Sequence, residues 1–125
     1  MGAVAETVVA NATAPSFREA HPDELEAYVA LLEANDPAAY AATCRVLADL
    51  DLRPELGRIT APVLLITGDL DGVTPPAAVD EVAGALRDVR RVEVPDTAHL
   101  LPWERPDVLR DEARGFLRES VRVPA

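Results

Sequence analysis

The sequence of 125 residues predicts an α/β fold in which helices precede and flank two parallel core strands. The first observation is a run of apolar and β-branched residues, Val63 to Thr67, between a proline and a glycine. Such a run is typical of a strand buried on both faces of a parallel sheet. The second is that strand, loop and helix alternate twice after residue 59, as in parallel strands with right-handed crossovers. Because only one partner strand is predicted for Val63–Thr67, we expect part of a sheet.

Before this region, residues 1–20 show no clear period, and no element is predicted there. A helix is predicted to begin near Pro22, since proline is well tolerated in the first helical turn. Its apolar face carries Leu25, Val29 and Leu32, which follow helical spacing. The segment Asn35-Asp36-Pro37 is expected to end this helix and to cap the next one.

A second short helix is predicted from this cap to about Asp51–Pro54, packed against the first in a hairpin. Tyr40, Cys44 and Leu47 form its apolar stripe. Cys44 is therefore expected to pack in a core. As the single cysteine of the sequence, it excludes an internal disulfide and argues against a cysteine-ligated metal site.

After the buried strand, a helix is predicted from about Pro76 to Leu86, and Arg91–Val94 alternates as a strand with one exposed face. Pro95–Trp103 is predicted to be a loop. An amphipathic helix is expected from about Pro106 to Val121, and its inward residues are Leu109, Ala113, Phe116 and Leu117.

The composition limits the class of protein. Acidic residues number 22 against 12 basic ones, all of them arginine, and the net charge is −10. Without a clustered basic stripe, this balance argues against binding of nucleic acid or an anionic membrane. No apolar run approaches the ~20 residues of a membrane span. The first six residues lack the basic region of a signal peptide, so we expect a soluble, cytoplasmic protein.

Two predicted loops carry side chains that suit acid–base chemistry. Asp69 and Asp71 follow the first strand, and His99 follows the second. The carboxyl ends of parallel strands meet at one edge of the sheet, where ligands and catalytic groups gather. An aspartate that accepts a hydrogen bond from one imidazole nitrogen lets the other nitrogen take a proton from a nucleophile. The residue types alone also allow a loop-capping aspartate and a surface histidine.

The stretch Pro62–Pro75, followed by Ala98–Pro106 and a closing amphipathic helix, resembles the C-terminal half of the α/β-hydrolase fold. In that family the acid lies three residues after the glycine that ends its strand, which implies Asp71 and not Asp69. The family histidine precedes the last helix, which implies His99. The resemblance implies that both are catalytic, in the chain order acid then histidine. No metal and no organic cofactor is implied.

Two further residues lie close to this histidine. Glu104 matches the Glu-x-Pro of the family, and we expect it to brace the histidine loop by hydrogen bonds. Trp103 is expected to pack beneath that loop, with a position in the pocket wall as the alternative.

Upstream, Asp36–Ala42, Leu50–Leu52 and Leu56–Ile59 are similar to the cap-to-core segment of 3-oxoadipate enol-lactonases and their close relatives. In those enzymes helices inserted between core strands form a lid over the active site. The resemblance therefore implies a cap-like or lid-like segment at 1–55 and the C-terminal part of the core at 56–125.

The sequence departs from the family in its nucleophile. An α/β-hydrolase carries a serine on a Gly-x-Ser-x-Gly turn, and these 125 residues contain no such stretch. The serines, Ser16 and Ser120, have no flanking glycines. The chain is expected to hold the acid and the base of a triad without its serine.

The sequence is compatible with three functional hypotheses. The first is the C-terminal portion of a carboxylic-ester or lactone hydrolase that acts on a small molecule; the chain would be a fragment, a truncated gene product or one piece of a split enzyme. The second is a catalytically silent half-fold that associates with itself, or with a complementary N-terminal half, through the edge of strand Val63–Thr67. The third, an unrelated small ligand-binding α/β domain, leaves the pairing of Asp71 with His99 unexplained.

Overall fold

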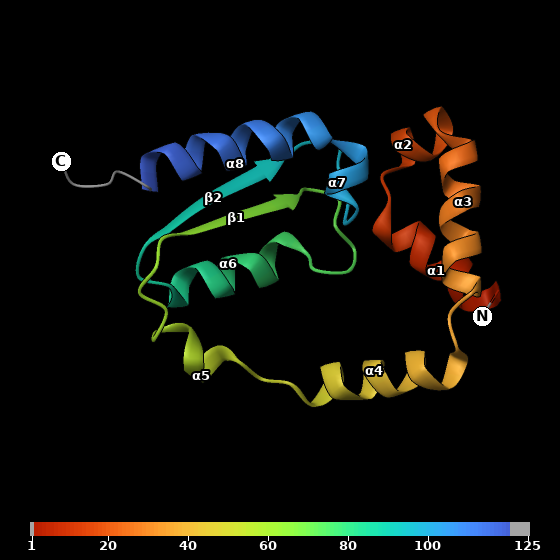
Figure 1. Ribbon diagram of the computed structural model, residues 1–125, viewed down its shortest axis with the longest axis horizontal. Helices are drawn as coiled ribbons and strands as arrows, with labels where there is room; N and C mark the ends of the chain where they lie inside the picture. The colour runs from red at the N-terminus through yellow and green to blue at the C-terminus, as the bar shows by residue number, and fades with distance from the viewer. Residues whose placement is uncertain (1, 121–125) are drawn as a thin grey trace.

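A computed structural model describes residues 2–120 of the chain (Figure 1). Its elements are α1 (Gly2–Ala12), α2 (Pro15–Ala20), α3 (Pro22–Glu33), α4 (Pro37–Asp49), α5 (Arg53–Leu56), β1 (Val63–Gly68), α6 (Pro76–Ala85), β2 (Val89–Val94), α7 (Leu101–Glu104) and α8 (Pro106–Ser120). None of the helices in this part of the chain has the length and apolar content that crossing a membrane requires.

Strands β1 and β2 are parallel, and their register runs from Val63 opposite Val89 to Gly68 opposite Val94. Helices α6 and α8 flank the two strands (Figure 1). No third strand lies beside β1 within residues 2–120. For this reason only the last two residues of β1 are buried and the first four are half-buried, so the expected burial on both faces is reached only at the carboxyl end of the strand.

The second half follows the predicted order of elements, with three differences. Strand β2 begins two residues earlier than predicted, because Val89 and Arg90 already pair with β1. The short helix α7 lies inside the predicted loop. In α8, Leu117 is 56% exposed, so its predicted inward position is wrong. The last residue of the predicted helix, Val121, lies outside the described residues.

Helices α1, α2 and α3 lie together at the carboxyl ends of the strands (Figure 1). The bounds of α3 agree with the prediction, and its predicted apolar face is half-buried. Helix α1 contacts α3 and buries small side chains, including Ala5 and Ala12. The short segment after α1 joins the two halves of the chain, because Ala14 and Phe17 form a buried cluster with Ala98 from the loop after β2.

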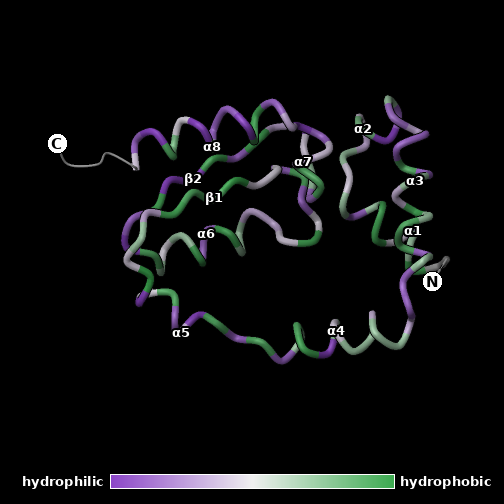
Figure 2. The backbone as a smooth tube through the Cα atoms, in the orientation of Figure 1, coloured by the Kyte–Doolittle hydropathy of each residue, from purple (hydrophilic) through white to green (hydrophobic). Residues whose placement is uncertain are grey.

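Helix α4 differs from its prediction in its environment. Asp36 caps it as expected, since the carboxylate accepts a hydrogen bond of 2.8 Å from the backbone N–H of Ala39. However, Cys44 is exposed and Leu47 is 62% exposed, so the predicted core stripe is wrong. The predicted hairpin is also wrong, because α4 runs away from α3 (Figure 1). Figure 2 shows hydrophobic residues along α4.

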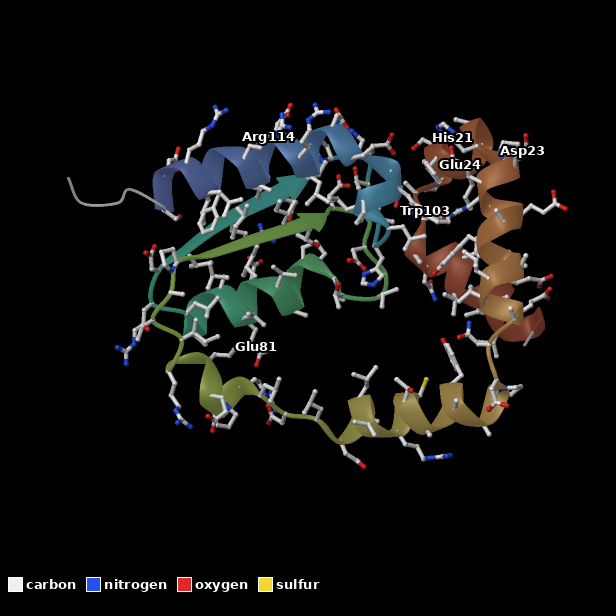
Figure 3. All side chains as sticks on the ribbon, in the orientation of Figure 1. His21, Asp23, Glu24, Glu81, Trp103 and Arg114 are labelled. Atoms are coloured by element: carbon white, nitrogen blue, oxygen red, sulfur yellow. The ribbon has the colours of Figure 1, made fainter. Side chains whose placement is uncertain are left out.

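Helix α5 connects this exposed segment to the strands and spans the boundary expected between 1–55 and 56–125. Its Arg53 forms an ion pair of 3.3 Å with Glu81 of α6. Glu81 is labelled in Figure 3. Because both side chains are mostly exposed, this pair adds little to stability.

Candidate active site

The loops after β1 and β2 are in direct contact at Gly68. A Cβ atom at this position would lie 2.0 Å from the carbonyl oxygen of Thr97, so only glycine fits. The backbone N–H of Leu70 then donates a hydrogen bond of 3.0 Å to the same carbonyl. Thr97 and Ala98 are 0% and 1% exposed. This close approach brings the side chains of the two loops to one place.

Asp71 is the buried carboxylate of this place, with 7% of its surface exposed. One of its oxygens accepts hydrogen bonds from the backbone N–H groups of Val73 at 2.8 Å and Thr74 at 2.7 Å. The other accepts one of 2.8 Å from the Thr74 hydroxyl. Burial by itself raises the pKa of Asp71, but the hydrogen bonds from His99, Thr74 and Val73 outweigh burial and hold the pKa below its ordinary value. Asp71 is therefore ionised at neutral pH.

His99 completes the pair. Its Nδ1 lies 3.0 Å from Oδ2 of Asp71. Since an ionised carboxylate can only accept hydrogen bonds, Nδ1 carries the proton of the neutral imidazole, and Nε2 is the nitrogen that can accept one. The side chain of His99 is 38% exposed and that of Asp71 is 5% exposed. This arrangement suits a general base whose outer nitrogen is accessible and whose inner nitrogen is held by a buried acid.

Asp69, the other acid of the loop, has a different role in the structure. Its carboxylate accepts a hydrogen bond of 3.3 Å from the backbone N–H of Thr97, and its side chain does not reach His99. Of the two carboxylates that follow the strand, the structure thus brings Asp71 to the histidine.

Glu104 holds the histidine loop against the N-terminal helices. Its carboxylate accepts hydrogen bonds of 3.2 Å from the backbone N–H of Ala98 and 3.0 Å from that of Ala14. The predicted brace is confirmed, and it reaches further than expected because it also binds the segment that follows α1.

The end of α1 contributes two more contacts, both through its main chain. The carbonyl of Asn11 accepts a hydrogen bond of 3.2 Å from Gly72, and that of Ala12 accepts one of 2.9 Å from Leu100. Both loops of the site are thereby attached to α1. Sequence reasoning missed this role, since main-chain carbonyls leave no signal in the residue types.

A cavity of about 520 Å³ adjoins His99. The two loops contribute His99, Gly72 and Val73 to its wall, and three helices contribute the rest, including Val8, Asn11, Tyr28, Leu32 and Tyr40. Trp103 packs against the edge of Tyr28, with ring centroids 5.3 Å apart. Figure 3 shows Trp103 between α7 and the helices α1–α3. Trp103 is 38% exposed and packs on Tyr28 of α3, so it does not line this cavity, which was the alternative position predicted for it. The two tyrosines were not singled out from the sequence as wall residues.

The described residues offer no cluster that suits a metal: nowhere in 2–120 do three or more His, Cys, Asp or Glu side chains come together as ligands. The chemistry that the site can perform is proton transfer at His99, with Asp71 stabilising the imidazolium.

Comparison with known proteins assigns the chain to a family. Residues 30–106 match the family model described as alpha/beta hydrolase fold. The chain belongs to this family. The predicted fold class and the resemblance to α/β-hydrolases are thereby confirmed.

Relatives of this α/β-hydrolase chain include enzymes named for esters and lactones. It is 38% identical to 3-oxoadipate enol-lactonase 2 of Acinetobacter baylyi over 74 residues. The aligned region covers 59% of this chain and 28% of the relative. It is 33% identical to a pimeloyl-(acyl-carrier protein) methyl ester esterase of Aromatoleum aromaticum over 112 residues. The aligned region covers 86% of this chain and 45% of the relative.

Solved structures agree with the fold. The enol-lactonase from Burkholderia xenovorans LB400 superposes with a TM-score of 0.86 at 31% identity, covering 94% of this chain and 45% of that one. A thermophilic esterase from Thermogutta terrifontis gives a TM-score of 0.86 at 26% identity, covering 95% of this chain and 44% of that one. The α/β-hydrolase chain described here thus spans less than half the length of these relatives and contains part of their fold.

Proposed function

We propose that this chain supplies the acid, Asp71, and the general base, His99, of a carboxylic-ester or lactone hydrolase. The observation that carries the proposal is the hydrogen bond of 3.0 Å between Nδ1 of His99 and the buried carboxylate of Asp71. It lies where two parallel strands end, which is where this fold class gathers its chemistry. The names of the relatives support esters and lactones as the substrate class.

The proposed reaction is acyl transfer through a serine that comes from outside the 125 residues. The serine oxygen attacks the carbonyl carbon of the ester or lactone while Nε2 of His99 takes its proton. The ionised Asp71 stabilises the imidazolium that forms. His99 then gives the proton to the leaving alcohol as the C–O bond breaks. In the second half, Nε2 of His99 takes a proton from water while the water oxygen attacks the carbonyl carbon of the acyl-serine. The bond between that carbon and the serine oxygen then breaks, the acid is released, and His99 gives the proton to the serine oxygen.

The proposed partner is a polypeptide with the remaining strands of the fold and the Gly-x-Ser-x-Gly turn. Two surfaces of this chain support such a partner. Strand β1 has one neighbouring strand within the described residues, so its second edge is open to a further strand. Helix α4 and the segment after it expose Val46, Leu47 and Leu50. In this arrangement residues 1–55 act as the cap of the site.

A second candidate function rests on the same open edge of β1. A half-fold with no turnover could use this edge to associate with itself or to bind another chain. This candidate accounts for the open edge and the exposed face of α4, but gives no role to the hydrogen bond between Asp71 and His99.

Reconstitution separates the two candidates. The chain is co-expressed with the serine-bearing part of a related full-length α/β-hydrolase, and hydrolysis of p-nitrophenyl acetate is measured. We expect turnover only when both parts are present, and its loss when the serine or His99 is replaced by alanine. Turnover by the 125-residue chain alone that is abolished by His99→Ala would contradict the proposal. A complex that forms without turnover would favour the second candidate.

A further inference from the structure

Two tyrosines lie in the wall of the cavity that adjoins His99. Tyr28 comes from α3 and Tyr40 from α4, and they are the only tyrosines of the chain. Both are half-buried. Two separate helices of the expected cap thus each contribute one tyrosine to the wall of the cavity that His99 also lines.

The wall around these phenols is mainly apolar or small, with Val8, Leu32 and Val73 among its members. A phenolic hydroxyl in such a wall is a neutral donor, and it loses free energy if it remains without a partner after water is displaced. An acceptor oxygen on a bound molecule would supply that partner.

Tyr28 is held in a fixed relation to the histidine loop. Its ring meets Trp103 edge to face at 5.3 Å, and the backbone N–H of Trp103 donates a hydrogen bond of 2.8 Å to Leu100, the residue after His99. Burial raises the pKa of Tyr28, and the neighbouring Tyr40 raises this pKa further. The hydroxyl of Tyr28 therefore stays protonated, as a donor, at neutral and mildly alkaline pH.

We propose that Tyr28 and Tyr40 are specificity-determining residues that select an acyl group with a second oxygen acceptor, a carbonyl or a carboxylate, apart from the reacting ester. This inference rests on the proposed function, because it assigns the cavity to the acyl part of the substrate. A site built to hydrogen-bond a polar group discriminates against an analogue that lacks it, since its own polar groups are then left unpaired. A plain alkyl ester has no second acceptor, so it would leave the hydroxyls of Tyr28 and Tyr40 without a hydrogen-bond partner.

Binding to the 125-residue chain tests the inference without turnover. The probes are dimethyl glutarate, which has a second ester carbonyl, and methyl hexanoate, which has a similar length and no second acceptor. Trp103 is the only tryptophan and contacts Tyr28, so its fluorescence and its indole N–H resonance report on the cavity. We expect dimethyl glutarate to bind about three- to tenfold more tightly, the range of one neutral hydrogen bond.

Variants assign this preference to the hydroxyls. Tyr28→Phe and Tyr40→Phe remove one hydroxyl each and keep the rings, so the contact with Trp103 is retained. Each is expected to reduce the preference, and the double variant to abolish it. Thr43→Val is the matched control, because it removes a hydroxyl of α4 that is bonded to the carbonyl of Ala39 and lies outside the cavity wall.

Three results would overturn the inference: equal binding of the two esters, no binding of either, or a preference that survives in the double variant. These results are independent of the reconstitution assay. Turnover by the completed enzyme without the preference would overturn this inference alone, whereas the preference without any turnover would overturn the proposed reaction. Monomethyl glutarate, in place of the dimethyl ester, distinguishes a carboxylate from a carbonyl as the second acceptor.

Discussion

The corner, formed by the loops where the two strands end, and helix α4 differ in how far the chain itself buries them. In the corner, Asp71 and Thr97 are 7% and 0% exposed. On α4, Val46 and Leu47 are 66% and 62% exposed, although they are apolar. Contacts within this chain thus bring Asp71 and His99 together, whereas the apolar side chains of α4 stay exposed in the described part of the chain.

Hydrogen bonds within the chain hold Asp71 and the two loops in place. Asp71 accepts them from its own loop, and Glu104 and the end of α1 attach both loops to the N-terminal helices. These partners all lie within the chain. An apolar helix face has no such local solution, because only another apolar surface can remove it from water.

The largest expected effect separates the two acids of the corner. Asp71→Asn in the reconstituted enzyme should lower kcat by about 10³–10⁴-fold, because the amide no longer holds the correct tautomer or stabilises the imidazolium. Asp69→Asn is the matched control, and its kcat should stay within a few-fold of the wild type. Equal losses in the two variants would show that the corner does not distinguish its carboxylates.

A glycine substitution tests how tightly the corner is packed. Gly68→Ala should destabilise the chain by about 3 kcal/mol or more in urea denaturation, because its Cβ would overlap the backbone of Thr97. Gly84→Ala in α6 meets nothing within 4 Å and should stabilise the chain by about 0.5–1 kcal/mol. If both variants unfold like the wild type, the close contact of the two loops does not exist in solution.

A substitution on the exposed face of α4 should affect binding of the complementary half more than the stability of the chain. Leu47→Ala is expected to change the free energy of unfolding of the chain alone by less than about 0.5 kcal/mol, since the side chain is mostly exposed. The same variant should bind the complementary half several-fold more weakly in a titration. A large loss of stability in the isolated chain would mean that α4 already packs on it.

The smallest effect concerns pH. The pKa of Asp71 is lowered in the folded chain. Its stabilisation is therefore fully present above the unfolded pKa of about 3.9 and is lost as the pH falls through the lower folded value. A carbon-detected NMR titration of the Asp71 carboxyl should give a midpoint below about 3.9. A midpoint at or above that value would contradict the hydrogen bonds assigned to it.

Much of the second half could be predicted because its signals are local. A continuous apolar run predicts β1, and the resemblance of two short stretches to α/β-hydrolases distinguishes Asp71 from Asp69 and points to His99 and Glu104. Helix α1 could not be predicted in this way, because its small residues show no period. It holds the loops of the site through main-chain carbonyls, which leave no signal in the sequence.

The apolar stripe of α4 shows the other limit. Helical spacing predicted correctly that Tyr40, Cys44 and Leu47 share a helix, but not that Cys44 and Leu47 would be exposed. A periodic pattern says which face is apolar, while burial depends on whether another surface lies against it. In the described part of the chain, α4 has no such surface over these two residues.

We propose that Asp71 and His99 already form their hydrogen-bonded pair in the isolated chain. Proton and nitrogen NMR of His99 in the isolated chain tests it most directly. We predict a single neutral tautomer with the proton on Nδ1, a downfield resonance for that proton, and loss of this resonance in Asp71→Asn. An imidazole that exchanges between both tautomers and is unaffected by Asp71→Asn would contradict the claim.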